Sequence, residues 1–456
     1  MKIVLADLKL CDPLVDPFRV VSQNYHGINF LAAGYLKSVI EKDSMTKKAD
    51  VEILIKESLL HNLEMLKREI VTRGPNLIGF SVYVWNYYRT LKLCELIKKE
   101  LPETKIVLGG PQVSFTADAI LEEFPSVDGI VRGEGEIVFL ELVRSMMQKK
   151  QFGKGILGLT YRNGNKIISN PPRPLLDDIN EIPSPYLTGT LDMSFFPKLE
   201  LETSRGCPFH CAYCVSCQIY NKIRFFNEKR VIEELKLATD YGIENVMFYD
   251  STFNLPQIVY NLCKKIAEEK KIKISFNAFL RPELINKKML DILERAGMSL
   301  VEIGIQSFNS KTLQLIHRTA DIEKIKETFK LLHRRDHHTV CDLILGLPGE
   351  TLDTMKEGIN LAYTFEGVIV GIFLLQVLPG SLLWTNNQEF GLEFMKNPPH
   401  FVISAPTFSR EELAESIRYG YSRYFKVMPR KLAKMVIEGK KVPRHHSLIF
   451  NPIFGG

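Results

Sequence analysis

The chain has 456 residues, of which 45% are apolar and 25% are charged, and it carries a formal net charge of +6. This length suggests two or three domains with sizeable cores, and the composition is ordinary for a globular protein. Its basic residues occur in short runs such as Lys98-Lys99 and Lys264-Lys265, and no apolar run reaches the ~18 to 20 residues that span a bilayer. Nucleic-acid binding by a basic block and a membrane span are therefore not expected.

Short β-rich runs alternate with amphipathic helical stretches over residues 1–150. We expect strands at 1–6, 51–56, 77–82, 105–108 and 129–131, and helices at 28–41, 60–73, 87–100, 117–123 and 137–148. This alternation predicts a doubly wound α/β domain.

Unusual residues follow the third, fourth and fifth expected strands. They are Ser81, Trp85 and Asn86, then Gly109 and Gly110, then Gly133, Glu134 and Gly135. Ligands of such sheets bind beyond the carboxyl ends of the strands, where glycines allow the backbone to approach a large ligand closely. An alternative is a flavodoxin-like scaffold whose glycines only form tight turns.

The remaining chain is expected to form a linker, a second α/β domain and a C-terminal region. Residues 151–198 contain six prolines, which disfavour regular helix, and we expect a linker there. Residues 199–391 alternate again, with strands expected after residue 199 and at 245–249, 274–279, 300–305, 339–345 and 368–376. Residues 392–456 contain a helical stretch at 411–425 and are expected to shape a substrate pocket.

Three cysteines, Cys207, Cys211 and Cys214, lie in one short loop with C-x3-C-x2-C spacing. Thiolates are the usual ligands of iron-sulfur clusters, and a 4Fe-4S cluster held by three of them keeps its fourth iron free for another ligand. A disulfide framework suits short secreted chains, and a structural zinc site normally takes four ligands from two knuckles. Cys217 leaves a four-cysteine electron-transfer cluster, or a shifted triad, as an alternative.

The cysteine loop, with Glu-Thr-Ser-Arg-Gly before Cys207 and Tyr213 before Cys214, resembles the signature of radical S-adenosylmethionine (radical SAM) enzymes. In that family the free iron binds SAM. The strand-end residues of the first domain resemble those of the cobalamin-binding domain that precedes one class of these enzymes. Asp7 to Cys11 lacks the histidine of mutase-type cobalamin proteins, which the radical SAM class generally lacks too.

The resemblance implies a cobalamin-binding domain over 1–150, a linker over 151–198, a partial (β/α)6 barrel over 199–391 and a mostly helical region over 392–456. It also implies contacts to SAM from strand ends of the barrel, as in complete α/β barrels. The expected contacts are Asp250, Arg281, Gln306, Arg318, Asp342 and Gly346. Ordinary alternatives are a loop cap for Asp250, a surface ion pair for Arg281, and a strand-to-helix turn at Gly346.

The family's chemistry implies C-methylation of an unactivated carbon, in which the cluster cleaves SAM to a 5'-deoxyadenosyl radical and methylcobalamin donates the methyl group. The expected partners are a small-molecule or peptide substrate and an external electron donor such as flavodoxin or ferredoxin, in a reducing cytoplasm. Radical rearrangement, cyclisation or oxidation with the same cofactors is an alternative, as is a non-catalytic sensor.

The pairs His337-His338 and His445-His446 lack ligand partners at metal-binding spacing. The remaining cysteines, Cys11, Cys94, Cys263 and Cys341, read as buried thiols.

Overall fold

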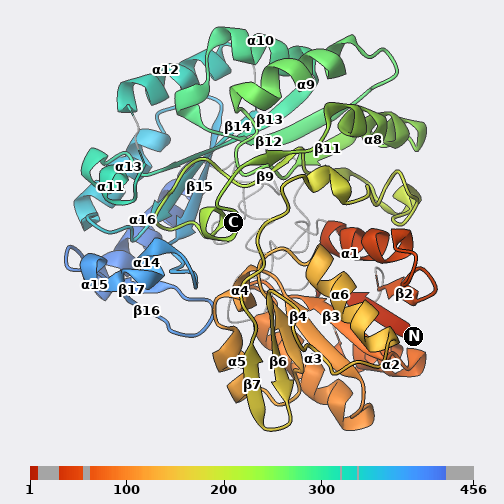
Figure 1. Cartoon of the computed structure of the whole chain (residues 1–456). Helices are drawn as coiled ribbons and strands as arrows, with labels where there is room; N and C mark the ends of the chain where they lie inside the picture. The colour runs from red at the N-terminus through yellow and green to blue at the C-terminus, as the bar shows by residue number, and fades with distance from the viewer. Residues whose placement is uncertain (9–29, 55–61, 319–320, 336–337, 428–456) are drawn as a thin grey trace. The chain divides into compact units, whose positions relative to one another are not determined.

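The computed structural model describes residues 1–8, 30–54, 62–318, 321–335 and 338–427, and these fall into two units (Figure 1). The first unit ends at Phe196, and the second continues from Pro197. The expectations for residues 9–11, His337, and the pair His445-His446 lie outside the described residues.

The first unit is built on a seven-stranded sheet with the order β2-β1-β3-β4-β5-β6-β7. Its first five strands pair in parallel, and from β1 the chain crosses to β2 on one side and then to β3 on the other. The strand order therefore reverses between β1 and β3, which is a switch point of a doubly wound sheet. The strands are β1 (Lys2–Ala6), β2 (Asp50–Ile53), β3 (Leu77–Ser81), β4 (Lys105–Gly109) and β5 (Gly129–Val131).

Helices cover this sheet on both faces, which is why its central strands are continuous apolar runs. Helix α2 contacts α3, and α1 contacts α6. The helices are α1 (Leu31–Lys42), α2 (Leu63–Arg73), α3 (Tyr87–Glu100), α4 (Pro111–Ser114), α5 (Ala117–Glu123) and α6 (Glu136–Met147). Local signals set their ends: Asn62 caps α2 by accepting from the backbone N–H of Glu64, and Gly74 ends it with a φ of +58°. The predicted α/β fold is confirmed.

Part of the segment expected to be a linker belongs to the first sheet. Within residues 151–198, β6 (Leu159–Asn163) and β7 (Lys166–Ser169) form a hairpin that adds to the sheet antiparallel to β5. Only short 3-10 turns follow, at Ile179–Glu181 and Met193–Phe195. The prolines that suggested a linker lie after β7, so they exclude helix without excluding the hairpin. The other predicted domain boundaries stay predictions.

The second unit contains a six-stranded parallel sheet with the order β15-β14-β13-β12-β11-β8. Because the spatial order follows the chain order, right-handed crossovers place the connecting helices on one face, and Figure 1 shows α8, α9, α10 and α12 along one side of the strands. This is the expected (β/α)6 arrangement. The strands are β8 (Leu199–Leu201), β11 (Asn245–Phe248), β12 (Ser275–Leu280), β13 (Met298–Gln306), β14 (His338–Leu345) and β15 (Val368–Leu374).

The connecting helices are α8 (Glu228–Asp240), α9 (Pro256–Glu268), α10 (Lys287–Arg295), α11 (Ser310–Leu315), α12 (Ile322–His333) and α13 (Leu352–Ala362). A 3-10 turn at Pro282–Leu284 precedes α10. On β12 and on β13 from Val301, every second residue is buried while the residues between them are partly exposed. The helix-covered face is therefore closed, and the opposite, inner face can be reached by water.

The other elements of the second unit lie around the cysteine loop and at the end of the described chain. Strands β9 (Ser204–Arg205) and β10 (Arg224–Phe225) form a small antiparallel pair, with α7 (Ser216–Ile219) between them. Helices α14 (Leu382–Thr385) and α15 (Asn387–Phe390) precede the pair β16 (Glu393–Phe394) and β17 (Val402–Ser404). Helix α16 (Arg410–Val427) contacts α13, β14 and β15. Among the helices in the described ranges, none combines the length and apolar character needed to cross a membrane.

Candidate functional site

The cysteine loop leaves β9 and returns through α7 to β10. Pairing of Arg205 with Arg224 closes its base. Gly206 begins the loop with a φ of +95°, and a Cβ there would collide with the backbone carbonyl of Lys222. A glycine is therefore required at this position. The loop presents Cys207, Cys211 and Cys214 as free thiols.

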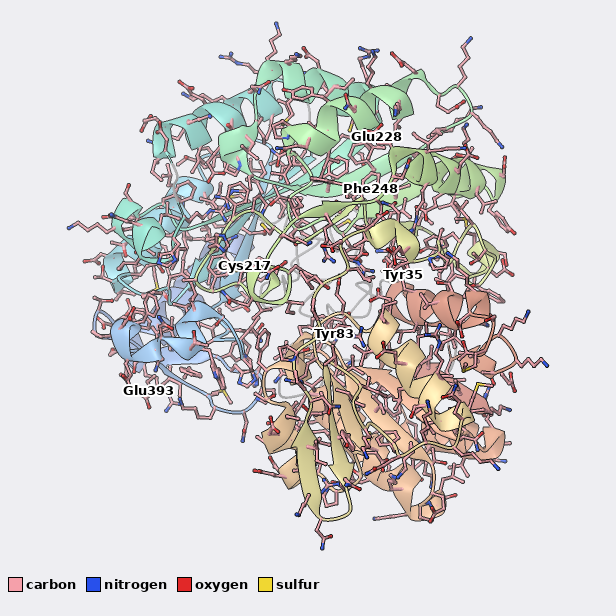
Figure 2. The ribbon with its side chains drawn as sticks, in the orientation of Figure 1. Tyr35, Tyr83, Cys217, Glu228, Phe248 and Glu393 are labelled. Carbon is pink, nitrogen blue, oxygen red and sulfur yellow. The ribbon has the colours of Figure 1, made fainter. Side chains whose placement is uncertain are left out.

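The thiols of this loop lie close enough to influence one another. Burial raises the pKa of Cys214 to about 12, with smaller contributions from the neighbouring thiols of Cys211, Cys217 and Cys207. Burial also raises the pKa of Cys217, which lies on α7 (Figure 2) with its sulfur 3.6 Å from the carbonyl oxygen of Cys214. Within the described ranges, no group of three His, Cys, Asp or Glu side chains lies close enough together to hold a metal ion as the side chains are placed. The triad and the role of Cys217 stay predictions.

The donor set nevertheless fits a thiolate-bound metal cluster. Clustered buried thiols resist ionisation, and metal binding is the usual way in which such groups become thiolates. Two cationic side chains, Arg281 and Arg318, lie beside the loop, where they would stabilise thiolates.

Two of the predicted SAM-binding residues, Arg281 and Arg318, contact the cysteine loop. The guanidinium carbon of Arg281 lies 3.7 Å from the ring centroid of Phe209, and its Nη1 lies 3.7 Å from the Cys211 sulfur. Arg318 donates to the Tyr213 hydroxyl at 3.2 Å and to the Gly304 carbonyl. The structure thus brings both arginines to the loop, while their contact with a SAM carboxylate stays a prediction.

Asp250 has a different environment from the one expected. It is fully buried, and its carboxylate accepts hydrogen bonds from the Thr203 backbone N–H (3.0 Å), the Thr203 hydroxyl (2.6 Å) and the Ser204 hydroxyl. Burial raises its pKa to about 6. Its oxygens are engaged by the segment that leads into the cysteine loop, and the expected contact of Asp250 with the SAM amino group stays a prediction. Asp250 anchors that loop to the end of β11.

Gln306 lies on the inner face at the end of β13, with a strained φ of +74°. Its side-chain amide folds over Gly304, where any Cβ would collide with it. Strain of this kind persists only where surrounding contacts enforce it, and it concentrates at functional sites. Deeper on the same face, Asp342 is 7% exposed, and burial together with Glu302 raises its pKa well above the ordinary range. Both predicted contacts therefore belong to one surface, and their binding to SAM stays a prediction.

The loop after β14 is tied to the end of β13 through Glu350, which the predicted site residues did not include. The Ser307 hydroxyl donates to Glu350 at 2.7 Å, and the backbone N–H groups of Leu347 and Gly346 also donate to this carboxyl. Burial raises the Glu350 pKa to about 8. Gly346 has a φ of +86°, which fits the strand-to-helix turn, and its contact with SAM stays a prediction.

Sequence reasoning also missed Glu283, Asn254 and Phe209. Glu283 pairs with Arg281 at 3.1 Å and lies 3.9 Å from Arg318. No periodicity in the chain announces these partners, since they meet only when the ends of β11 and β12 and the cysteine loop come together. The short spacing between Arg281 and Glu283 was the one local signal.

In the first unit, the Asn86 side chain forms hydrogen bonds with other residues of the protein. It is fully buried, and its amide donates to Asp7 (3.2 Å) and to the carbonyls of Leu8 and Ser81 (3.1 Å each). Its oxygen accepts from the Tyr83 backbone N–H at 2.8 Å. Asn86 therefore ties the loops after β1 and β3 together, and its expected contact with a ligand stays a prediction.

Next to Asn86, the Tyr83 ring (Figure 2) stacks on Trp85, with the ring centroids 4.4 Å apart. Trp85 and Ser81 are partly exposed at the end of β3, so both remain candidate contacts.

The strand-end glycines differ in what surrounds them. A Cβ on Gly110, whose φ is +114°, would lie 2.5 Å from the Val82 carbonyl oxygen, so the local backbone rather than a ligand requires this glycine. A Cβ on Gly109 would be in ordinary contact with Val131 at 3.8 Å. Gly133 has a φ of +77°, and a Cβ built on it would have no atom within 4 Å. A Cβ on Gly135 would lie 3.4 Å from the Leu36 side chain. Glu134 accepts from the Leu176 backbone N–H at 3.4 Å. Gly133 is thus the glycine that best fits a ligand-facing role.

Two family models match this chain in the two regions just described. The B12 binding domain matches residues 31–143, and the Radical SAM superfamily matches residues 201–362.

Three curated relatives and one solved structure are similar over most of the chain. An uncharacterized methyltransferase of Pyrococcus horikoshii is 28% identical, covering 93% of this chain and 92% of its own. The cobalamin-dependent radical SAM methyltransferase TokK of Streptomyces tokunonensis is 26% identical over 82% of this chain, which spans only 57% of TokK. An anaerobic magnesium-protoporphyrin IX monomethyl ester cyclase of Rubrivivax gelatinosus is 24% identical, covering 86% of this chain and 72% of the cyclase. The structure of the radical SAM methyltransferase TsrM from Kitasatospora setae superimposes with a TM-score of 0.72 at 16% identity, covering 92% of this chain and 88% of TsrM, and supports the fold.

Proposed function

Because this chain is a radical SAM enzyme with an N-terminal B12-binding domain, we propose that it methylates an unactivated carbon of a small-molecule or peptide substrate. The observation that carries the proposal is the presence of both matched regions in one chain that is also similar, over 93% of its length, to an uncharacterized methyltransferase. An external donor such as flavodoxin or ferredoxin would supply electrons, and the free thiols suit a reducing cytoplasm.

We assign each cofactor to residues of this chain. Cys207, Cys211 and Cys214 would hold a 4Fe-4S cluster, and the strand ends around Trp85 and Gly133 would hold cobalamin. When bound, the cluster supplies the electron that cleaves SAM, and cobalamin carries the methyl group.

The protein's own residues fix positions and exclude water. Asp250 anchors the strand that enters the cysteine loop, and Arg281 and Arg318 brace the loop from the barrel. Gln306 and Asp342 line the inner face of the sheet, where a substrate and SAM would be held in fixed orientation. Holding reactants in this way is the main contribution that a protein makes to cofactor chemistry.

The test is the fate of the methyl group of SAM. Reduced, reconstituted protein is incubated with SAM labelled in its methyl group and with metabolites of the source cells, and labelled products are identified by mass spectrometry. We expect label in the product. Product formed at full rate without label would overturn methyl transfer and favour cyclisation or rearrangement, which the similarity to the cyclase keeps as the second candidate. Absence of any SAM cleavage would favour a sensor.

A further inference from the structure

Arg281 is held in place through its backbone. It follows β12 directly, and its side chain is 9% exposed. Its backbone N–H donates to the Asn254 side-chain oxygen, and its carbonyl accepts from the Asn254 amide, both at 2.9 Å. Asn254 is itself fully buried in the loop after β11. The two-way bond therefore leaves the start of the Arg281 side chain little freedom.

The guanidinium is held on three sides. One face lies over the Phe209 ring at 3.7 Å. On one edge, Nε and Nη2 donate to the two carboxylate oxygens of Glu283 at 3.3 and 3.1 Å. This two-point pairing fixes the plane of the guanidinium. The remaining nitrogen, Nη1, lies 3.7 Å from the Cys211 sulfur.

This arrangement places a permanent positive charge and an N–H donor beside one sulfur of the predicted cluster triad. Reduction adds negative charge to a cluster, so a nearby cation and hydrogen bonds to its sulfurs favour the reduced state. Because Cys211 is 6% exposed and Arg281 is buried, water screens their interaction only weakly. Glu283 partly offsets the charge of Arg281.

We propose that Arg281 is a positioning residue that orients Cys211 and raises the reduction potential of the cluster, with Glu283 limiting the size of that effect. The inference rests on the proposed function only in that it requires the cluster, and it does not depend on methyl transfer. Arg318 acts differently, because it reaches the loop through the Tyr213 hydroxyl and not through a sulfur atom.

The experiment compares full-length variants reconstituted anaerobically with iron and sulfide. Iron content is measured first, and the midpoint potential of the cluster is then obtained from a redox titration followed by electron paramagnetic resonance, without substrate. Arg281→Gln and Arg281→Met remove the charge, and Met retains apolar contact with Phe209. Glu283→Gln removes the opposing charge, while Asn254 still holds the Arg281 backbone and Phe209 still contacts the guanidinium. Arg335→Gln is the control, since Arg335 pairs with Glu294 and Asp291 before β14, at the opposite ends of the strands.

We expect both neutral Arg281 variants to shift the midpoint to more negative potentials, Glu283→Gln to shift it to more positive ones, and Arg335→Gln to leave it at the wild-type value. Neutral variants with full iron content and an unchanged midpoint would overturn the inference. If neither neutral variant binds iron, Glu283→Gln decides, and its wild-type midpoint would overturn the inference equally. A wild-type protein that takes up no cluster would instead refute the proposed function.

Discussion

At the scale of single residues, the ligand count of the cysteine loop gives the sharpest prediction. Cys207→Ala, Cys211→Ala and Cys214→Ala should each lose SAM cleavage, because a cluster held by two thiolates lacks the three protein ligands that leave one iron free. Cys217→Ala should retain cleavage. Iron content and 5'-deoxyadenosine formation after anaerobic reconstitution measure both. Loss of activity in Cys217→Ala together with survival of Cys207→Ala would show that the triad is assigned wrongly.

A second prediction at this scale concerns Glu350, whose pKa burial raises from 4.5 to about 8. Between pH 4.5 and about 8 the folded protein therefore keeps the Glu350 proton, whereas the unfolded chain has released it. The contribution of the protonated Glu350 to stability is fully present below pH 4.5 and is lost as the pH rises through about 8. Glu350→Gln cannot titrate. We expect the difference in thermal unfolding midpoint, wild type minus variant, to fall from acidic to mildly alkaline pH.

The exposed helix residue Glu357 provides a matched control, since Glu357→Gln makes the same chemical change at the surface. Other buried carboxyl groups, Asp250 and Glu302 among them, titrate in wild type and variants alike and cancel in the comparison. A pH-independent difference for Glu350→Gln would mean that the buried carboxyl is not protonated as we infer.

At the scale of elements, the strand and helix positions were predictable because they depend on local periodicity. Helix α5 spans the predicted residues 117–123, and β13 extends the predicted 300–305 by only a few residues. The hairpin of β6 and β7 was missed because its pairing with β5 is a non-local contact at a sheet edge. The partners of the site were missed for the same reason: Asp250 meets Thr203 across 47 positions, and Arg281 meets Cys211 across 70.

The loop after β5 carries the third prediction. Gly133 and Gly155 have nearly equal positive φ angles, +77° and +74°. The Cβ that Gly133→Ala or Gly155→Ala would add has no atom within 4 Å. Each should therefore cost about 1–2 kcal/mol of stability from backbone strain. Only Gly133 lies at a strand end of the proposed cobalamin site, so only Gly133→Ala should weaken cobalamin retention while iron content stays unchanged.

Visible absorption of protein reconstituted with cobalamin reports retention, and thermal unfolding of the cofactor-free protein verifies that the two substitutions are equally destabilising. Equal cobalamin retention in both variants would remove Gly133 from the site. Gly110 is unsuitable for this purpose, because a side chain there would strike the Val82 backbone whether or not cobalamin binds.

At the scale of the whole molecule, two units with separate sheets divide the proposed chemistry, since one carries the B12-binding match and the other the radical SAM match. A methyltransferase of this kind needs two molecules of SAM with different fates: one is cleaved to start the reaction, and the other supplies the methyl group. With its true substrate, the enzyme should therefore form 5'-deoxyadenosine and S-adenosylhomocysteine in comparable amounts.

Chromatography of both nucleosides over a single reaction course measures this ratio. Cys207→Ala, Cys211→Ala and Cys214→Ala should form no 5'-deoxyadenosine. Gly133→Ala should lower S-adenosylhomocysteine more than it lowers 5'-deoxyadenosine, because its defect lies in the unit proposed to bind cobalamin. A wild-type enzyme that makes product and 5'-deoxyadenosine with almost no S-adenosylhomocysteine would instead be performing a cyclisation, rearrangement or oxidation. In that case the assignments of both cofactor sites would stand, and only the last step of the proposed reaction would change.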